Sequence, residues 1–254
     1  MRSLRQQVED ALYYLERPTP KEGDREKAID ILSSIARGKK AGAALVKAIR
    51  ESNPTTNAAG VPWGSLKGLV LVIAIGHEPG AGASGERAWN GKLAKSMKKV
   101  LELCGATVYI YFHKVKSYSA RQNKLGDYCD LVGAFACWEL HYDAYHKPSA
   151  NGHHFKYLGA KKWALYTQEE WANHYPHSVA RNSYGDGPGL HHATSGNGSG
   201  FVKRMPCWAL LPEPFFNSND AEREFFKPRI DEIAIIYCIG LARFANFKSL
   251  NNAK

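Results

Sequence analysis

The sequence predicts an α/β fold: a mostly parallel, twisted sheet with helices on both faces, preceded by a small N-terminal helical unit. The first observation is the apolar run at 68–75 (GLVLVIAI), which is followed by a helix-patterned segment and a second strand-like run. A crossover of this length joins parallel neighbouring strands, and such a sheet is covered on both faces. The second observation is a hydrophobic content of 44% over 254 residues, which is ample for a globular core.

The chain is basic, with a formal net charge of +10. Such a surplus favours an anionic partner, such as nucleic acid, a membrane surface or a bacterial wall polymer. No compact Arg-rich run or nucleic-acid motif accompanies the charge, so we expect no nucleic-acid partner, and a merely solvated basic surface is as open as a dedicated binding patch. No apolar run is long enough for stable membrane insertion. The sequence carries no signal for the oligomeric state.

Two features of the sequence indicate the compartment. Residues 1–16 form a charged amphipathic segment unlike a secretory signal, so we expect the chain to be made and to fold in the cytoplasm. The cysteines form an odd, scattered set without a C-x-x-C pair, which predicts neither a disulfide framework nor a Cys-zinc site. The five are Cys104, Cys129, Cys137, Cys207 and Cys238.

Residues 1–60 are predicted to form a helical accessory unit. Apolar residues recur there at helical spacing in three stretches, separated by Pro18, Pro20 and Gly38. The unit is too small to bury a large core alone, and two interpretations are open, a wall-binding module and a helical cap on the main domain. A turn-rich linker then leads into the second predicted domain, residues 66–254.

The second domain is predicted to begin with a βαβ unit. Its parts are a strand at 69–75, a helix at 86–104 and a strand at 107–112. The helix has an apolar face that includes Leu93, Met97 and Leu101, while most of its lysines fall outward. Gly105 ends the helix.

The remaining elements of the domain give shorter signals. Four segments are predicted: helices at 119–128 and 168–182, and strands at 131–138 and 206–211. Six glycines within 185–200 predict a loop too flexible for the core, either a lid over a cleft or a surface connection. From Asp220 onward the chain is helical, with an interruption near Pro228.

A histidine and a glutamate frame the Gly-rich loop that follows the first strand. His77 lies where the strand ends, which is where ligands bind in open α/β sheets, and Glu86 opens the next helix. Glycines between them allow the loop to fold back, so both side chains can converge. Imidazole and carboxylate suit Zn²⁺. A simpler interpretation is also open, in which Glu86 only favours the helix dipole and His77 is a satisfied histidine at a strand end.

The stretch GHEPGAGASGERAWN at 76–90 resembles the opening motif of the zinc-dependent N-acetylmuramoyl-L-alanine amidases, the amidase_3 family. In that family a strand runs into G-H, P-G-A and E-x-x-x-N, and the histidine and glutamate bind zinc. The resemblance therefore implies zinc ligands at His77 and Glu86. Asn90 matches the asparagine of the motif and is expected to contact substrate.

A second segment, ELHYDA at 139–144, resembles the family's S-x-H-x-N-A, which supplies the second zinc histidine. The resemblance implies that His141 is the third ligand. Glu139 stands where the family has serine, and Asp143 stands where it has asparagine. Asp143 is expected to contact substrate, and as a carboxylate it could instead orient an imidazole.

Three further histidines, His146, His153 and His154, follow this segment. Each could be a ligand, a substrate contact or merely exposed. His146 is the most credible substitute ligand, ranked below His141. His153 is expected to contact substrate.

A third segment, ALLPEPFFNSNDAE at 209–222, resembles the family's final motif, in which a strand leads to L-x-E-x-x-F-x-S/T-N and an acidic residue. The glutamate of that motif is the catalytic acid/base, so the resemblance implies this role for Glu213. Phe216, Asn219 and Glu222 match the tail of the motif. Three motifs in the family's order, within residues 68–246, are more specific than any one of them.

The resemblance implies a zinc hydrolase that cuts the amide between N-acetylmuramic acid and L-alanine of peptidoglycan. Because no secretory signal is recognised, we expect a bacteriophage endolysin that accumulates in the host cytoplasm and reaches the wall after release by a membrane-permeabilising partner. Two alternatives stay open. One is a zinc carboxypeptidase or another peptidoglycan peptidase, and the other is a non-catalytic protein that binds cell wall or nucleic acid.

Overall fold

The computed structural model describes residues 66–182, 186–196 and 198–252. The accessory unit predicted at 1–60 lies outside the described residues, and its two interpretations stay predictions. The contacts of the chain group residues 66–244 into one compact unit, which contains every candidate site residue. Within the described part of the chain, no helix is both long and apolar enough to cross a bilayer.

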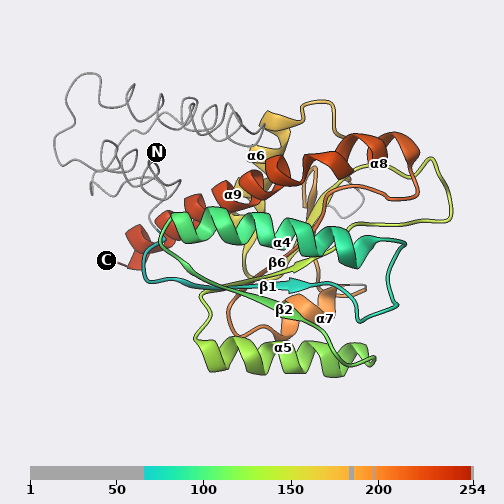
Figure 1. Ribbon diagram of the computed structural model, residues 1–254. Helices are drawn as coiled ribbons and strands as arrows, with labels where there is room; N and C mark the ends of the chain where they lie inside the picture. Colours follow the sequence, from blue (N-terminus) through green and yellow to red (C-terminus); the bar gives the residue numbers. More distant parts are fainter. Residues whose placement is uncertain (1–65, 183–185, 197, 253–254) are drawn as a thin grey trace, which may run out of the picture. The chain divides into compact units, whose positions relative to one another are not determined.

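A six-stranded sheet forms the centre of this unit (Figure 1). Its order is β2-β1-β3-β6-β4-β5, and every neighbouring pair is parallel except β4 with β6. The strands are β1 (Val70–Ile75), β2 (Thr107–Phe112), β3 (Ala136–Leu140), β4 (His154–Tyr157), β5 (Leu190–His192) and β6 (Trp208–Glu213). The mostly parallel sheet confirms the predicted fold class.

Helices cover both faces of the sheet, with α4, α6 and α9 on one side and α5 and α7 on the other (Figure 1). Their bounds are α4 (Glu86–Leu103), α5 (Tyr118–Val132), α6 (Lys161–His174), α7 (Ser199–Arg204), α8 (Asp220–Phe226), the 3₁₀ turn η1 (Lys227–Arg229) and α9 (Ile230–Asn252). On the first side, the rings of Trp163 and Phe244 stack with centroids 5.9 Å apart, which joins α6 to α9.

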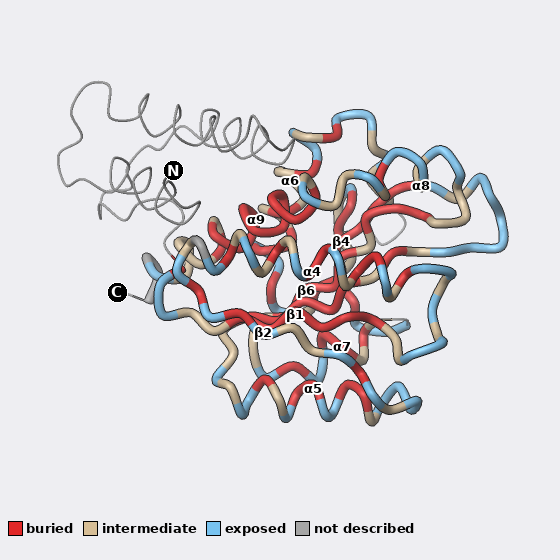
Figure 2. The backbone as a smooth tube through the Cα atoms, viewed as in Figure 1, coloured by how far each residue is buried: buried red, intermediate tan, exposed pale blue. Residues whose placement is uncertain are grey.

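Alternation along β1 divides the apolar core between the two faces. Val72 and Ala74 pack with Leu125 of α5 and Phe201 of α7. Because successive side chains point to opposite faces of a strand, Ile73 and its alternating neighbours face the other side, where they are fully buried. Figure 2 shows buried residues along the strands and the inward helix faces, while the connecting loops are largely exposed.

The predicted βαβ unit is confirmed, because β1, α4 and β2 begin and end within one residue of their expected bounds. The strand predicted at 131–138 is wrong in its first half. Helix α5 continues to Val132, Gly133 ends it with φ 65°, and β3 begins only at Ala136. Leu131 is 81% exposed, so its apolar side chain was no sign of a core strand.

Two predictions further along the chain are also wrong. The helix expected at 168–182 is α6, which lies at Lys161–His174. The segment 185–200 is not only a loop, because it contains β5 and begins α7, and Leu190 is buried. Strand β4, with the sequence HFKY, was not predicted at all. His154 and Lys156 occupy alternate positions of this strand and are polar, so the segment has no apolar run. They are buried because β4 pairs with β6.

Candidate metal centre

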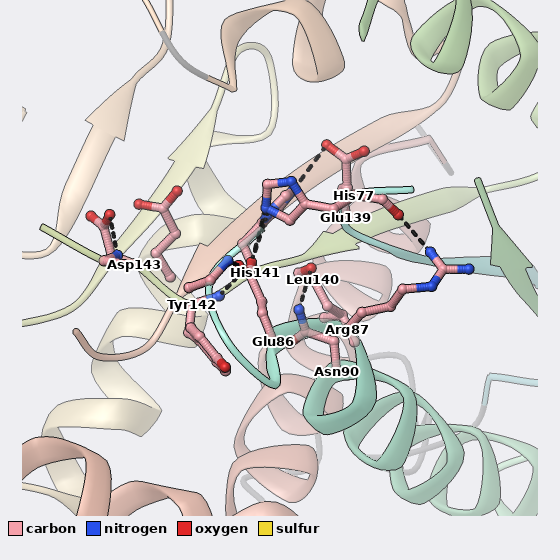
Figure 3. A network of polar contacts seen from close by, with 12 residues as sticks. His77, Glu86, Arg87, Asn90, Glu139, Leu140, His141, Tyr142 and Asp143 are labelled. Carbon is pink, nitrogen blue, oxygen red and sulfur yellow. Dashed lines mark hydrogen bonds and ion pairs between the residues drawn. The ribbon is translucent and has the colours of Figure 1, made fainter. Parts of the chain in front are cut away.

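The three predicted ligands come from neighbouring parts of one sheet edge. His77 lies two residues after β1, His141 directly follows β3, and Glu86 is the first residue of α4. Strands β1 and β3 are parallel neighbours, so their carboxyl ends meet at the same edge. Figure 3 shows the side chains of these residues turned toward one another.

The three candidate ligand atoms form a nearly equilateral triangle, the ligand triangle. His77 Nε2 lies 3.2 Å from Glu86 Oε1, His141 Nδ1 lies 3.1 Å from the same oxygen, and the two nitrogens are 3.2 Å apart. A tetrahedral zinc ion with bonds of about 2.0–2.2 Å separates its ligand atoms by about 3.3–3.6 Å. Two imidazoles and one carboxylate, with the fourth position left open, are typical of a catalytic zinc site. The residues therefore fit a zinc ion.

Protonated His141 partly offsets the carboxylate charges at the centre when no cation is bound. Burial acts to raise the pKa of Glu86, but hydrogen bonds with His141 and His77 outweigh it and lower the pKa to about 2. Burial acts against charge on His141, yet Glu139 and Glu86 raise the pKa of its imidazole to about 10. A metal ion would replace this proton, because zinc binds neutral imidazole.

Glu139 contacts His141 at Nε2, the ring nitrogen that does not face the ligand triangle. Its Oε2 lies 3.4 Å from His141 Nε2, while its Oε1 lies 2.8 Å from His113 Nε2 and accepts a 2.8 Å hydrogen bond from Gln122. Burial acts to raise the pKa of Glu139, but hydrogen bonds with His113 and His141 hold it well below its usual range. A carboxylate in this place fixes the ring so that Nδ1 faces the ligand triangle.

Sequence reasoning missed His113 and Gln122 as members of this centre. His113 directly follows β2, at the same sheet edge as the ligands, and this position was a usable signal. Gln122 comes from α5, and only the packing of that helix brings it to Glu139.

The Gly-rich loop fits tightly around the ligands. His77 has φ 65°, a left-handed conformation that costs a non-glycine residue about 1–2 kcal/mol. Such local strain is common at functional sites. A Cβ atom at Gly82 would lie 2.6 Å from His77 Cδ2 and 2.9 Å from Glu86 Oε2. The loop also donates the Ala83 N–H to Glu86 Oε2 at 2.9 Å, and Arg87 donates to the His77 carbonyl at 2.6 Å.

Two predicted substrate contacts lie close to this centre in the fold. Asn90 is fully buried, and its amide donates a 2.8 Å hydrogen bond to the Leu140 carbonyl, which ties α4 to the end of β3 (Figure 3). Asp143 accepts a 2.6 Å hydrogen bond from Arg181. Burial and the nearby charge of Glu213 raise the pKa of Asp143 to about 6. Contact of either residue with substrate stays a prediction.

Two other histidines from the sequence analysis lie outside the ligand triangle. The ring of His153 is buried, with Nδ1 2.9 Å from Ser178 Oγ and Nε2 2.8 Å from Gln168 Oε1. Burial lowers the pKa of His153 to about 4. His146 is exposed, and its ring lies against Tyr145 with centroids 4.0 Å apart. A role of His153 in substrate binding stays a prediction.

Glu213 ends β6, the strand next to β3 in the sheet. The two strands are parallel, so Glu213 lies at the same sheet edge as His77 and His141. Its Oε1 accepts a 2.7 Å hydrogen bond from Lys156, and its Oε2 lies 2.6 Å from His154 Nε2. Burial acts to raise the pKa of Glu213, but Lys156 and His154 hold it well below its usual range.

The tail of the third motif shapes the turn after β6. Asn219 caps α8 by accepting the N–H of Glu222 at 3.1 Å. The carboxylate of Glu222 then accepts the backbone N–H groups of Phe216 at 2.8 Å and Gly152 at 2.7 Å. These contacts fix the backbone immediately beyond Glu213.

Comparison with known proteins found similar solved structures but no similar curated sequence. No family model and no curated protein sequence matches it. The amidase Ami1 from Mycobacterium smegmatis aligns with a TM-score of 0.58 and 14% identity, over 71% of this chain and 98% of that one. The catalytic domain of the amidase CwlV from Bacillus (Paenibacillus) polymyxa aligns with a TM-score of 0.56 and 17% identity, over 70% and 98%.

A third solved structure is the catalytic domain of the CD27L endolysin targeting Clostridia difficile. It aligns with a TM-score of 0.56 and 19% identity, over 69% of this chain and 97% of that one. At these identities the comparisons show a shared fold. Each aligns over almost its whole length.

Proposed function

We propose that this chain is a zinc-dependent peptidoglycan hydrolase that cuts the amide between N-acetylmuramic acid and L-alanine of the stem peptide. The observation that carries the proposal is the ligand triangle of His77, Glu86 and His141, with Glu213 at the end of a neighbouring strand. The solved structures with this fold that bear the name amidase support this reaction class. The net charge of +10 suits an anionic wall polymer.

The ligand triangle, Glu213 and Glu139 each have a defined role in this proposal. Zn²⁺ held by His77, Glu86 and His141 would lower the pKa of a water molecule and polarise the carbonyl of the scissile amide. Glu213 is an ionised carboxylate and would accept the proton of the attacking water. It would then give that proton to the departing nitrogen, since an amide nitrogen leaves poorly unless it is protonated. Glu139 keeps His141 in its orientation.

The proposal is tested by digesting purified peptidoglycan and identifying the new ends by mass spectrometry. We expect intact glycan strands and free N-terminal alanine, lost on treatment with a zinc chelator and in Glu213→Gln. Glu224→Gln, at an exposed position of α8, is the matched control and should retain activity. Release of a C-terminal residue would instead identify a carboxypeptidase, and wall binding without cleavage would identify a non-catalytic protein.

We further propose that the hydrolase acts in the lysis of a bacterial host by a phage. The test expresses the chain in the host cytoplasm with and without a membrane-permeabilising protein. Lysis should require both proteins, and Glu213→Gln should abolish it. Lysis without the permeabilising protein would contradict this setting.

A further inference from the structure

The buried lysine of β4 has no role in the ligand triangle. Lys156 is 5% exposed, and all four residues of β4 are buried. Lysine is almost never buried unless it is paired, and an apolar side chain in its place would avoid the cost of desolvating a charge. Its Nζ donates a 2.7 Å hydrogen bond to Glu213 Oε1. The lysine therefore points at the group that we propose as the acid/base.

The sheet and its surroundings fix this lysine in place. The antiparallel register sets His154 opposite Glu213, and Lys156 lies two residues further along the same face of β4. A Cβ atom at Gly198 would lie 3.0 Å from Lys156 Cδ, and Gly198 itself has φ 84°. The backbone before α7 thus approaches the lysine stem as closely as only a glycine allows.

Several other ionisable groups surround Glu213. In the described part of the chain they are His154 of β4, Asp143 after β3, Arg181 before β5, His191 of β5 and Tyr237 of α9. Burial lowers the pKa of His154, and it lowers that of His191 to about 4, so neither ring carries a full charge near neutral pH. His154 then acts on Glu213 through its 2.6 Å polar contact. Burial also raises the pKa of Tyr237, which keeps it neutral.

Among the described residues, the cations Lys156 and Arg181 form ion pairs with Glu213. Arg181 Nη1 lies 2.6 Å from Asp143 Oδ2 but 3.7 Å from Glu213 Oε2, so this nitrogen is hydrogen-bonded to Asp143. The ammonium group of Lys156, in contrast, donates directly to the Glu213 carboxylate at 2.7 Å.

We propose that Lys156 is a positioning residue that keeps Glu213 ionised and holds its carboxylate in place for proton transfer. The inference rests on the proposed function. When a water proton moves to Glu213, the Lys156 ammonium group loses its anionic partner. The cation then favours transfer of the proton from the Glu213 hydroxyl group to the nitrogen of the leaving amine. Without the lysine, Glu213 would hold this proton more tightly.

The direct test is a titration of Glu213 that does not depend on activity. In zinc-loaded protein with ¹³C-labelled glutamate, the Glu213 carboxyl signal is identified by its loss in Glu213→Gln. We expect Lys156→Met to raise the titration midpoint by about 1–3 pH units, as removal of a close cation does, while Lys156→Arg preserves it. Lys99→Met, at an exposed position of α4, should change nothing.

A second neutral variant keeps the test decisive. If Lys156→Met fails to fold, Lys156→Gln takes its place, because its amide retains a hydrogen-bond donor without the charge. An unchanged midpoint in the folded neutral variant would overturn the inference.

Kinetics separate the inference from the proposed function. On the wall amide we expect Lys156→Met to lower kcat at least about 10-fold with little change in KM, because proton transfer and not binding is impaired. On an anilide analogue, whose leaving group needs less protonation, Lys156→Met should lower kcat by a smaller factor. If the wild-type protein cleaves no wall amide, the proposed function fails, and the titration still decides what Lys156 does to Glu213. If the wild-type protein is active and Lys156→Met matches it on both substrates, only the inference fails.

Discussion

Glu139 is the residue on which the orientation of His141 depends. It contacts His141 on one oxygen and is held on the other by His113 and Gln122. We expect Glu139→Gln to weaken zinc binding by about 10–100-fold. The neutral amide oxygen is a weaker hydrogen-bond acceptor for the His141 imidazole than the carboxylate is. Competition with a chromogenic chelator measures the affinity. Glu102→Gln, at an exposed position of α4, is the control, and equal affinities for the two variants would contradict this role.

Local sequence predicted the meeting of His77, Glu86 and His141 better than it predicted the residues that contact them. His77, Glu86 and His141 each lie at the end of a strand or the start of a helix, and such positions are readable from short motifs. Glu139 meets His113 and Gln122 only after β2, β3 and α5 have packed together. Lys156 likewise meets Glu213 through the pairing of β4 with β6. Such pairings join distant parts of the chain and leave no local pattern.

The Gly-rich loop between β1 and α4 offers a matched pair of substitutions. Gly80 and Gly82 both have positive φ, 83° and 87°, so alanine is strained at either position. Only at Gly82 would the new methyl group collide with His77 and Glu86, while nothing lies within 4 Å of a Cβ at Gly80. We expect both variants to lose about 1–2 kcal/mol of stability, and only Gly82→Ala to lose most of its zinc affinity as well.

Isothermal titration with zinc and denaturation of the metal-free variants separate these two effects. If Gly80→Ala weakened zinc binding as much as Gly82→Ala, backbone strain and not the collision would explain the loss. The close approach of Gly82 to His77 and Glu86 would then have no effect of its own on zinc affinity.

Two helix glycines test how the helices pack. A Cβ atom at Gly240 of α9 would lie 2.3 Å from Thr167 Oγ1 and 2.8 Å from Thr167 Cα, so α9 approaches α6 through a side with no side chain. We expect Gly240→Ala to lower the free energy of unfolding by about 1–3 kcal/mol through overpacking. Gly91→Ala on α4 meets nothing within 4 Å and should instead stabilise by up to about 1 kcal/mol. Urea denaturation measures the free energy of unfolding of both variants. A loss of stability in Gly91→Ala would contradict the prediction that only Gly240 is packed too closely for a methyl group.

Elements with a regular apolar pattern were predictable, and elements defined by their partners were not. The unit β1, α4 and β2 follows directly from its periodicity. Strands β4 and β5 are short. The polar side chains of β4 are buried, and His191 of β5 is partly buried, only because other strands and loops cover them. The same cause places Lys156 in the core, so the missed strand and the missed positioning residue have one physical origin.

At the scale of the whole molecule, ionisation of the candidate metal centre couples folding to pH. In metal-free protein the pKa of His141 rises from 6.5 to about 10, so its stabilisation is complete below pH 6.5 and is lost as the pH rises through 10. The pKa of Glu86 falls from 4.5 to about 2, so its stabilisation is complete above pH 4.5 and is lost as the pH falls through 2. Both contributions are complete between pH 4.5 and 6.5.

Zinc should change this dependence, because the ion takes the place of the His141 proton. Binding then releases a proton, and the apparent zinc affinity should rise by up to about tenfold per pH unit between 6.5 and 10. At a free zinc concentration of about 100 times the dissociation constant, the ion stabilises the fold by about 2.7 kcal/mol, or roughly 5–10 °C in Tm for a domain of this size. We therefore expect a larger zinc-induced rise in Tm near pH 8 than near pH 6 at equal free zinc.

Differential scanning calorimetry with a zinc buffer and with a chelator measures this rise at each pH. Glu86→Gln removes a ligand but leaves both histidines, so its Tm should respond little to zinc at either pH. A rise that is equal at the two pH values in the wild-type protein would mean that no proton leaves when zinc binds. In that case His141 would already be neutral in the metal-free fold, and the carboxylates of Glu86 and Glu139 would face each other across it without a compensating charge.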